Sequence, residues 1–264
     1  MEAVQRRLAA AVLCALAGLV LSSQARAEED EPAATPFRPT VTSGANISLP
    51  GWLELELGGQ RLGGHDFERR NTLPYLLKYS LNEQWALLVG GDAHVRSTDA
   101  GGLNRSGAGD TSLTLKFRGN GVPEGHSYGF EASIKFPTAA SGLGSGERDY
   151  SLKGIYGIDL PEGFHLDTNL MASKVGGVPA GQGQYQTLWA AAVSHPVGDA
   201  WTLALDLSGT RQAGLPSTSQ LLGAASYAVN KRLVLDAGLA AGLNSNSPKW
   251  TAFCGLTVLM GQLN

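Results

Sequence analysis

From Gly51 to the end of the chain, apolar side chains recur at every second position in segments of about ten residues. The segment 201–210, WTLALDLSGT, shows the pattern, with tryptophan and leucine at the odd positions from 201 to 207 and Thr, Ala, Asp, Ser and Thr at the even ones. A period of two is the period of a β-strand, because successive side chains point to opposite faces. The chain is therefore restricted to β-sheet in which one face is apolar and the other polar.

Twelve segments of this kind follow one another without a helical period between them. The predicted strands are 51–60, 72–81, 84–96, 109–118, 126–137, 148–159, 163–174, 184–195, 200–211, 218–229, 232–243 and 249–260. A soluble sandwich would hide the apolar face in its core, whereas a membrane barrel would turn that face toward lipid.

The connections between the segments favour the barrel. Short turns such as NE at 82–83 and NK at 230–231 alternate with longer ones such as 97–108 and 138–148, and the turn at 119–126 is a longer exception among the short ones. Outer-membrane barrels have short periplasmic turns, longer external loops and an even number of strands. The length of the segments also suits the 9 to 11 residues that a tilted strand needs to cross a bilayer. We predict an all-β fold, a transmembrane antiparallel up-and-down β-barrel of about 12 strands.

The N-terminus has the features of a secretory signal peptide. Arg6 and Arg7 precede the apolar run LAAAVLCALAGLVL, and ARA follows it at 25–27. The run has 14 residues, which is short of the roughly 20 that a membrane-spanning helix needs. We therefore expect residues 1–27 to be a signal peptide, 28–50 a flexible N-terminal arm or a plug, and 51–264 the barrel.

Composition excludes several classes of function. The formal net charge is −3 and no block of basic residues is present, so nothing predicts binding to nucleic acid. The two cysteines, Cys14 and Cys254, form no metal-binding motif, and no cofactor is expected.

The polar face of the predicted strands would line the barrel lumen. Its charged members that we select as lumen-facing pathway candidates are Lys116, Arg118, Glu131, Lys135, Lys153, Asp206 and Asp236. Two interpretations stay open: the charges pair across the wall and fill the barrel, or a positive wall faces a negative one and selects small solutes by size and charge. A barrel of twelve strands lies between a filled interior and an aqueous channel, so we expect a narrow or partly plugged pore.

Two stretches resemble a known family. GDTSLTLKFRG at 109–119 and FEASIKFPTAASGLGSGERDYSLKGIYG at 130–157 are similar to the outer-membrane transporters named for the meta-pathway of phenol degradation. In that family a Gly-Asp strand start is followed by a strand that ends in lysine, an apolar residue, Pro and Thr, and then by a glycine-rich loop. The resemblance implies an outer-membrane barrel that acts as a channel for small molecules, with hydrophobic or aromatic compounds suggested by the family name.

One departure from this family concerns the last strand. Such barrels end on an aromatic residue that the assembly machinery reads, whereas this chain ends LMGQLN. Either the last strand stops near Met260 and a short tail follows, or insertion uses a weaker signal.

An enzyme is not expected, because the chain has no GxSxG elbow, HExxH motif or phosphate-binding loop. His94 and His165 are the histidines predicted to face inward, and Arg96 and Asp167 are predicted to face inward beside them. The two histidines would be the first candidates for a lipid-modifying barrel enzyme. A structural barrel with a blocked lumen is the other alternative to a channel.

The expected partners follow from these arguments. They are the lipid of the outer membrane of a Gram-negative bacterium, a small-molecule solute and the barrel assembly machinery, with a monomer as the default state.

Overall fold

The computed structural model describes residues 31–64, 67–99 and 101–263, and the predicted signal peptide lies outside these residues. The strands are β1 (Trp52–Gly63), β2 (Phe67–Ser80), β3 (Trp85–Asp99), β4 (Asn104–Gly107), β5 (Thr111–Arg118), β6 (His126–Phe136), β7 (Asp149–Asp159), β8 (His165–Lys174), β9 (Tyr185–Val197), β10 (Trp201–Gln212), β11 (Thr218–Asn230), β12 (Leu233–Gly242) and β13 (Trp250–Gln262). A single 3₁₀ turn, η1 (Pro161–Gly163), lies between β7 and β8 in the described chain. Among the described residues, no helix has the length and apolar character needed to cross a membrane.

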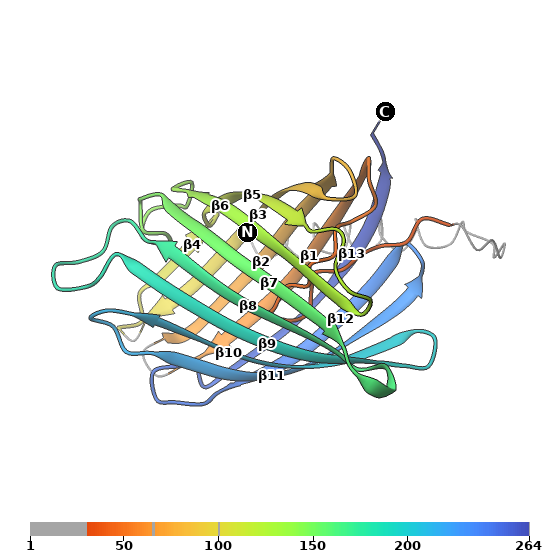
Figure 1. Cartoon of the computed structure of the whole chain (residues 1–264). Coiled ribbons are helices and arrows are strands. Elements are labelled where there is room, and N and C mark those ends of the chain that lie inside the picture. The colour runs from red at the N-terminus through yellow and green to blue at the C-terminus, as the bar shows by residue number, and fades with distance from the viewer. Residues whose placement is uncertain (1–30, 65–66, 100, 264) are drawn as a thin grey trace, which may run out of the picture. The chain divides into compact units, whose positions relative to one another are not determined.

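The strands form one closed antiparallel wall. Strands that follow one another in sequence pair, except that β5 pairs with β3 and not with β4, and β1 closes the ring by pairing with β13 from Trp52–Gln262 to Gly63–Trp250. Figure 1 shows the strands following one another around this wall, tilted against its axis. In the described residues β4 pairs only with the end of β3, so twelve strands make the barrel. Closure leaves no sheet edge whose backbone groups would be unpaired in lipid.

The two faces of the wall are those that the alternation predicts. On β10, Leu203 and Leu205 are 49% and 61% exposed, whereas Asp206 is 0% exposed. Apolar residues are exposed in the same way on neighbouring strands, for example Leu221, Leu239 and Leu170. The exposed leucine face is the face that contacts lipid, and the polar face lines the lumen.

The strands extend further than predicted at the ends with longer connections. β1 reaches Gly63 and β2 begins at Phe67, so most of the loop expected at 61–71 is strand, and β4 lies inside the loop expected at 97–108. Hydrophobic alternation disappears where both faces of a strand are wet, but the backbone ladder continues, which is why these extensions were missed. At the other end of the barrel, where the connections are short, β13 runs to Gln262 instead of ending near Met260.

A β-bulge corrects the predicted direction of two side chains. Leu73 pairs with His94 and Pro74 with Asp92, so Ala93 is an extra residue on β3 and the alternation shifts by one. Beyond it, Val95 is fully buried, while Arg96 is exposed and His94 contacts the exposed Ser106 (Nε2 to Oγ, 3.0 Å). The prediction that His94 and Arg96 face inward was therefore wrong.

We predict that Leu205→Lys destabilises the barrel by about 2–4 kcal/mol, because it places a charge on the lipid face in the middle of β10. Equilibrium unfolding in lipid vesicles with urea measures this cost. Leu215→Lys, the same substitution at an exposed leucine in the connection after β10, is the control and should leave the unfolding midpoint nearly unchanged. Equal effects of the two substitutions would contradict the assignment of the lipid face.

Candidate functional site

The lumen is lined by buried charged side chains contributed by six strands of the wall. They share the inward face of their strands and are at most 7% exposed: Glu54, Glu56, Lys78, Lys116, Glu131, Asp206 and Asp236. A buried charge is costly unless it is paired or hydrogen-bonded. The partners of these charged side chains therefore decide which charges are left for a solute in the lumen.

The chain that precedes β1, residues 31–50, supplies many of these partners and is called the arm below. The backbone N–H of Thr35 donates to Glu54 Oε2 (2.8 Å), and that of Phe37 donates to Glu56 Oε1 (2.7 Å). The arm belongs to no strand, so its N–H groups have no ladder partners and the carboxylates of β1 accept from them instead.

The middle of the arm contacts carboxylates on two further strands, β12 and β10. Arg38 forms a forked ion pair with Asp236 on β12, with Nη2 2.9 Å from Oδ1. Thr42 donates to Asp206 Oδ2 on β10 through both its N–H (2.8 Å) and its hydroxyl (2.7 Å). Both ends of the arm lie at the end of the barrel with short connections, because Ala34 N–H donates to the carbonyl of Lys231 and Ser48 contacts Ser80.

Three of the predicted residues meet on one stretch of wall. Glu131 on β6 lies between Lys116 on β5 (3.4 Å) and Lys153 on β7 (2.7 Å), because the register places these residues side by side. Both ammonium groups also donate to the arm, Lys116 to the Gly44 carbonyl (2.7 Å) and Lys153 to the Ser43 hydroxyl (3.0 Å). The basic wall thus contains its own counter-charge and also holds the arm.

An aromatic ring from the arm lies between two buried lysines. The Nζ atoms of Lys78 and Lys116 are 4.0 Å and 3.7 Å from the centre of the Phe37 ring. Lys78 is also paired with Glu54 and with Glu56 (2.6 Å). These cation–π contacts give the arm an anchor of a second kind besides its polar ones.

The remaining predicted residues lie apart from this centre. Lys135 is at the end with longer connections, where it pairs with Asp149 (2.6 Å) and Asp110 (3.3 Å). Arg118 is exposed at the opposite end of the neighbouring strand. Asp206 and Asp236 lie on the far side and contact the arm instead of the basic wall. Sequence analysis missed Phe37, Arg38 and Thr42, which lie in a polar stretch with no strand period to indicate where they point.

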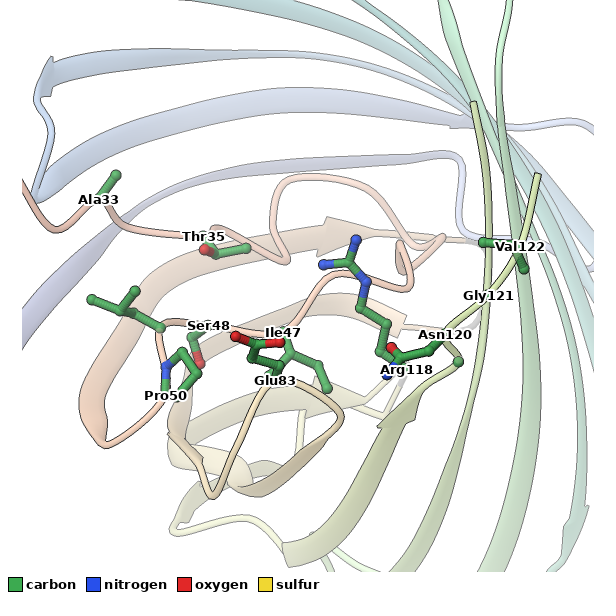
Figure 2. Close-up of a pocket in the computed structure, with 12 residues that line it drawn as sticks. Ala33, Thr35, Ile47, Ser48, Pro50, Glu83, Arg118, Asn120, Gly121 and Val122 are labelled. Carbon is green, nitrogen blue, oxygen red and sulfur yellow. The ribbon is translucent and has the colours of Figure 1, made fainter. Parts of the chain in front are cut away.

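Two cavities lie against the arm. One, of about 580 Å³, is lined by arm residues, by Glu83 and Arg118, and by the turn from Gly119 to Val122. Figure 2 shows the Arg118 side chain, with Asn120 and Val122, opposite Thr35 and Ser48 of the arm. This turn is the longer exception noted among the short connections. The second cavity, of about 260 Å³, is bounded by Phe37, Arg38 and Ser43 of the arm and by the wall from β1 to β7.

A separate cluster contains His165. Its Nδ1 lies 2.6 Å from Asp159 and its Nε2 lies 3.4 Å from Asp167, all near the start of β8. The described residues show no hydrogen bond between this imidazole and a serine hydroxyl. The imidazole thus lies between two carboxylates.

Comparisons with known proteins agree with the fold. The family model described as "Putative MetA-pathway of phenol degradation" matches residues 38–259. No curated protein sequence matches the chain. Among solved structures, an outer membrane channel from Pseudomonas putida F1 is similar with a TM-score of 0.63 and 17% identity, over 89% of this chain and 100% of that one.

Two porins are similar as well. NanC has a TM-score of 0.57 and 9% identity, over 78% of this chain and 100% of that one. KdgM, in complex with disordered oligogalacturonate, has a TM-score of 0.55 and 7% identity, over 79% of this chain and 99% of that one. At these identities the likeness concerns the fold, a closed barrel that spans the outer membrane of Gram-negative bacteria with its apolar face in lipid. The family match covers most of the sequence, and the chain belongs to the family named for the MetA pathway of phenol degradation.

Proposed function

We propose that this protein is an outer-membrane channel for small solutes, that its arm closes the lumen, and that the channel opens when the arm moves. The observation that carries this proposal is the path of the arm. It makes contacts with inward-facing groups on β1, β5, β7, β8, β10 and β12 and lies against both cavities. A segment in that position narrows any route between the two ends of the barrel.

The contacts that hold the arm suit a reversible closure. Apart from the ring of Phe37 and the buried Ala45, they are hydrogen bonds and ion pairs with polar lumen groups, which water can replace when the arm leaves. Both ends of the arm lie at the end with short connections, so it can withdraw in that direction without crossing the barrel.

The solutes that we propose are small, and hydrophobic or aromatic in keeping with the family name. Their route runs from Lys135 at one end, past Lys116, Glu131 and Lys153, to Arg118 at the other, with Asp206 and Asp236 on the opposite wall. The route carries four basic and three acidic groups, so its charges nearly balance and its narrow width would select more strongly than its net charge.

The main alternative is a structural barrel whose lumen stays blocked, which the same arm contacts would produce if the arm never moved. A lipid-modifying enzyme is a weaker alternative, because His165 pairs with two carboxylates and His94 faces away from the lumen. Conductance separates the first alternative from the channel.

We predict that locking the arm abolishes ion current. Thr42→Cys with Asp206→Cys, in a Cys254→Ser background, replaces two side chains that contact each other (Oγ1 to Oδ2, 2.7 Å), which brings the two thiols near each other for an oxidant to join. Planar-bilayer recordings of the mature protein should show no current when the pair is oxidised and stepwise current when it is reduced. The two single-cysteine variants are the controls and should not respond to reductant. If all forms that show heat-modifiable migration on gels fail to conduct, the lumen is a permanent seal and the structural alternative holds.

We also predict that Lys153→Gln shifts the ion preference of the open channel toward cations, because it removes a positive charge that is 17% exposed in the lumen. The reversal potential in a salt gradient measures this shift. Lys174→Gln, which changes an exposed lysine at the outer end of β8, is the matched control and should leave the reversal potential unchanged. A shift of equal size in both variants would contradict the assigned route.

A further inference from the structure

We infer that the 260 Å³ cavity beside the arm is a binding site for one neutral aromatic ring that carries a hydrogen-bond donor, with phenol as the simplest example. The inference rests on the proposed function, because it names the class of solute that the closed channel takes up. It comes from the size of the cavity, from the arrangement of its lining and from its charge balance.

The size of the cavity sets the size of the solute. An apolar cavity of about 150 Å³ is large enough to hold benzene in another protein, and typical ligand pockets begin at about 300 Å³. A cavity of about 260 Å³ therefore has room for one ring with a small substituent or a water molecule beside it. Two fused rings with substituents would not fit without displacing the arm.

The lining divides into an apolar part and a polar part. Phe37 of the arm, Pro74 and Leu76 of β2 and Leu88 of β3 form the apolar part. Thr114, Glu131 and Lys153, on β5, β6 and β7, form the polar part. Apolar walls with a few convergent polar groups are typical of small-molecule sites, and Phe37 can pack against an aromatic solute edge to face.

The charges that line the cavity already balance. They are two cations, Arg38 and Lys153, and two carboxylates, Glu56 and Glu131. Each has a partner: Arg38 pairs with Asp236, Lys153 with Glu131, and Glu56 with Lys78. A charged solute would enter without a counter-ion of its own and would be penalised for losing its hydration. The site therefore favours a neutral solute.

Glu131 has room to accept a hydrogen bond from the solute. An ionised carboxylate offers about four lone-pair sites, and the ammonium groups of Lys116 and Lys153 take two of them. The Lys116 contact is the longer one, at 3.4 Å, and involves Oε1. A phenolic O–H donated to this carboxylate would be a charge-assisted bond, whereas a benzoate has no proton to donate.

The test is isothermal titration of the full mature protein in detergent at pH 7 with phenol and with benzoate, against detergent blanks. Phenol is neutral at this pH and benzoate is ionised. We expect saturable binding of phenol at one site, and benzoate affinity lower by about tenfold or more, since burial of an unpaired charge costs more than the ring contacts return. Benzoate binding as tight as phenol binding, or phenol heat no greater than the blank, would overturn the inference.

Two adjacent leucines on opposite faces of β3 provide the variant and its control. Leu88 lines the cavity and is 4% exposed, whereas Leu87 is 38% exposed on the lipid side. Leu88→Trp fills the cavity and should lower phenol affinity by about tenfold or more, the equivalent of losing the burial of one ring. Leu87→Trp should leave it unchanged. If Leu88→Trp does not fold, as judged by heat-modifiability, Leu76→Phe fills the same cavity from β2.

Binding and conductance can fail independently. Selective phenol binding by a protein that never conducts would refute the proposed channel and leave the site intact. A protein that conducts but binds phenol and benzoate equally, or whose Leu87 and Leu88 variants bind phenol equally, would refute the site and leave the channel intact.

Discussion

Burial of charge in a narrow lumen is the constraint on which the rest of the structure depends. Lys78, Lys116 and Asp206 have no solvent exposure, so each must find a partner within the protein. The wall alone provides partners for the lysines, but Asp206 and Asp236 are hydrogen-bonded or paired only through the arm in the described chain. The arm thus supplies the hydrogen-bond donors and the positive charge that Asp206 and Asp236 need in order to be buried in the lumen.

The same constraint explains how a segment without secondary structure has a defined place. Residues 35–44 have few backbone ladder partners, and lumen side chains accept and donate in their stead. Phe37 adds an apolar ring between two ammonium groups. Apart from the buried Ala45, these contacts are polar or cation–π, so the arm has a defined path and is yet held by interactions for which water can substitute. A defined path and contacts that water can replace are the two properties that a movable closure needs.

The wall could be predicted because its two solvents differ so strongly. Lipid on one side and a wet lumen on the other impose a strict alternation, and all twelve predicted segments have a barrel strand that corresponds to them. Prediction failed where that contrast ends. The extensions of β1 and β2 lie beyond the alternating region, and the extra residue Ala93 reverses the pattern on β3 without any signal in the local sequence.

The sequence by itself determined the strands, their inward and outward faces and the charged character of the lumen, because alternation is a local property that lipid enforces residue by residue. Only the tertiary structure decided which charges meet. Glu131 lies between Lys116 and Lys153 through the register of three strands, and Arg38 reaches Asp236 across 198 positions of sequence. Such pairings depend on closure of the barrel and on the path of the arm, and no local pattern encodes them.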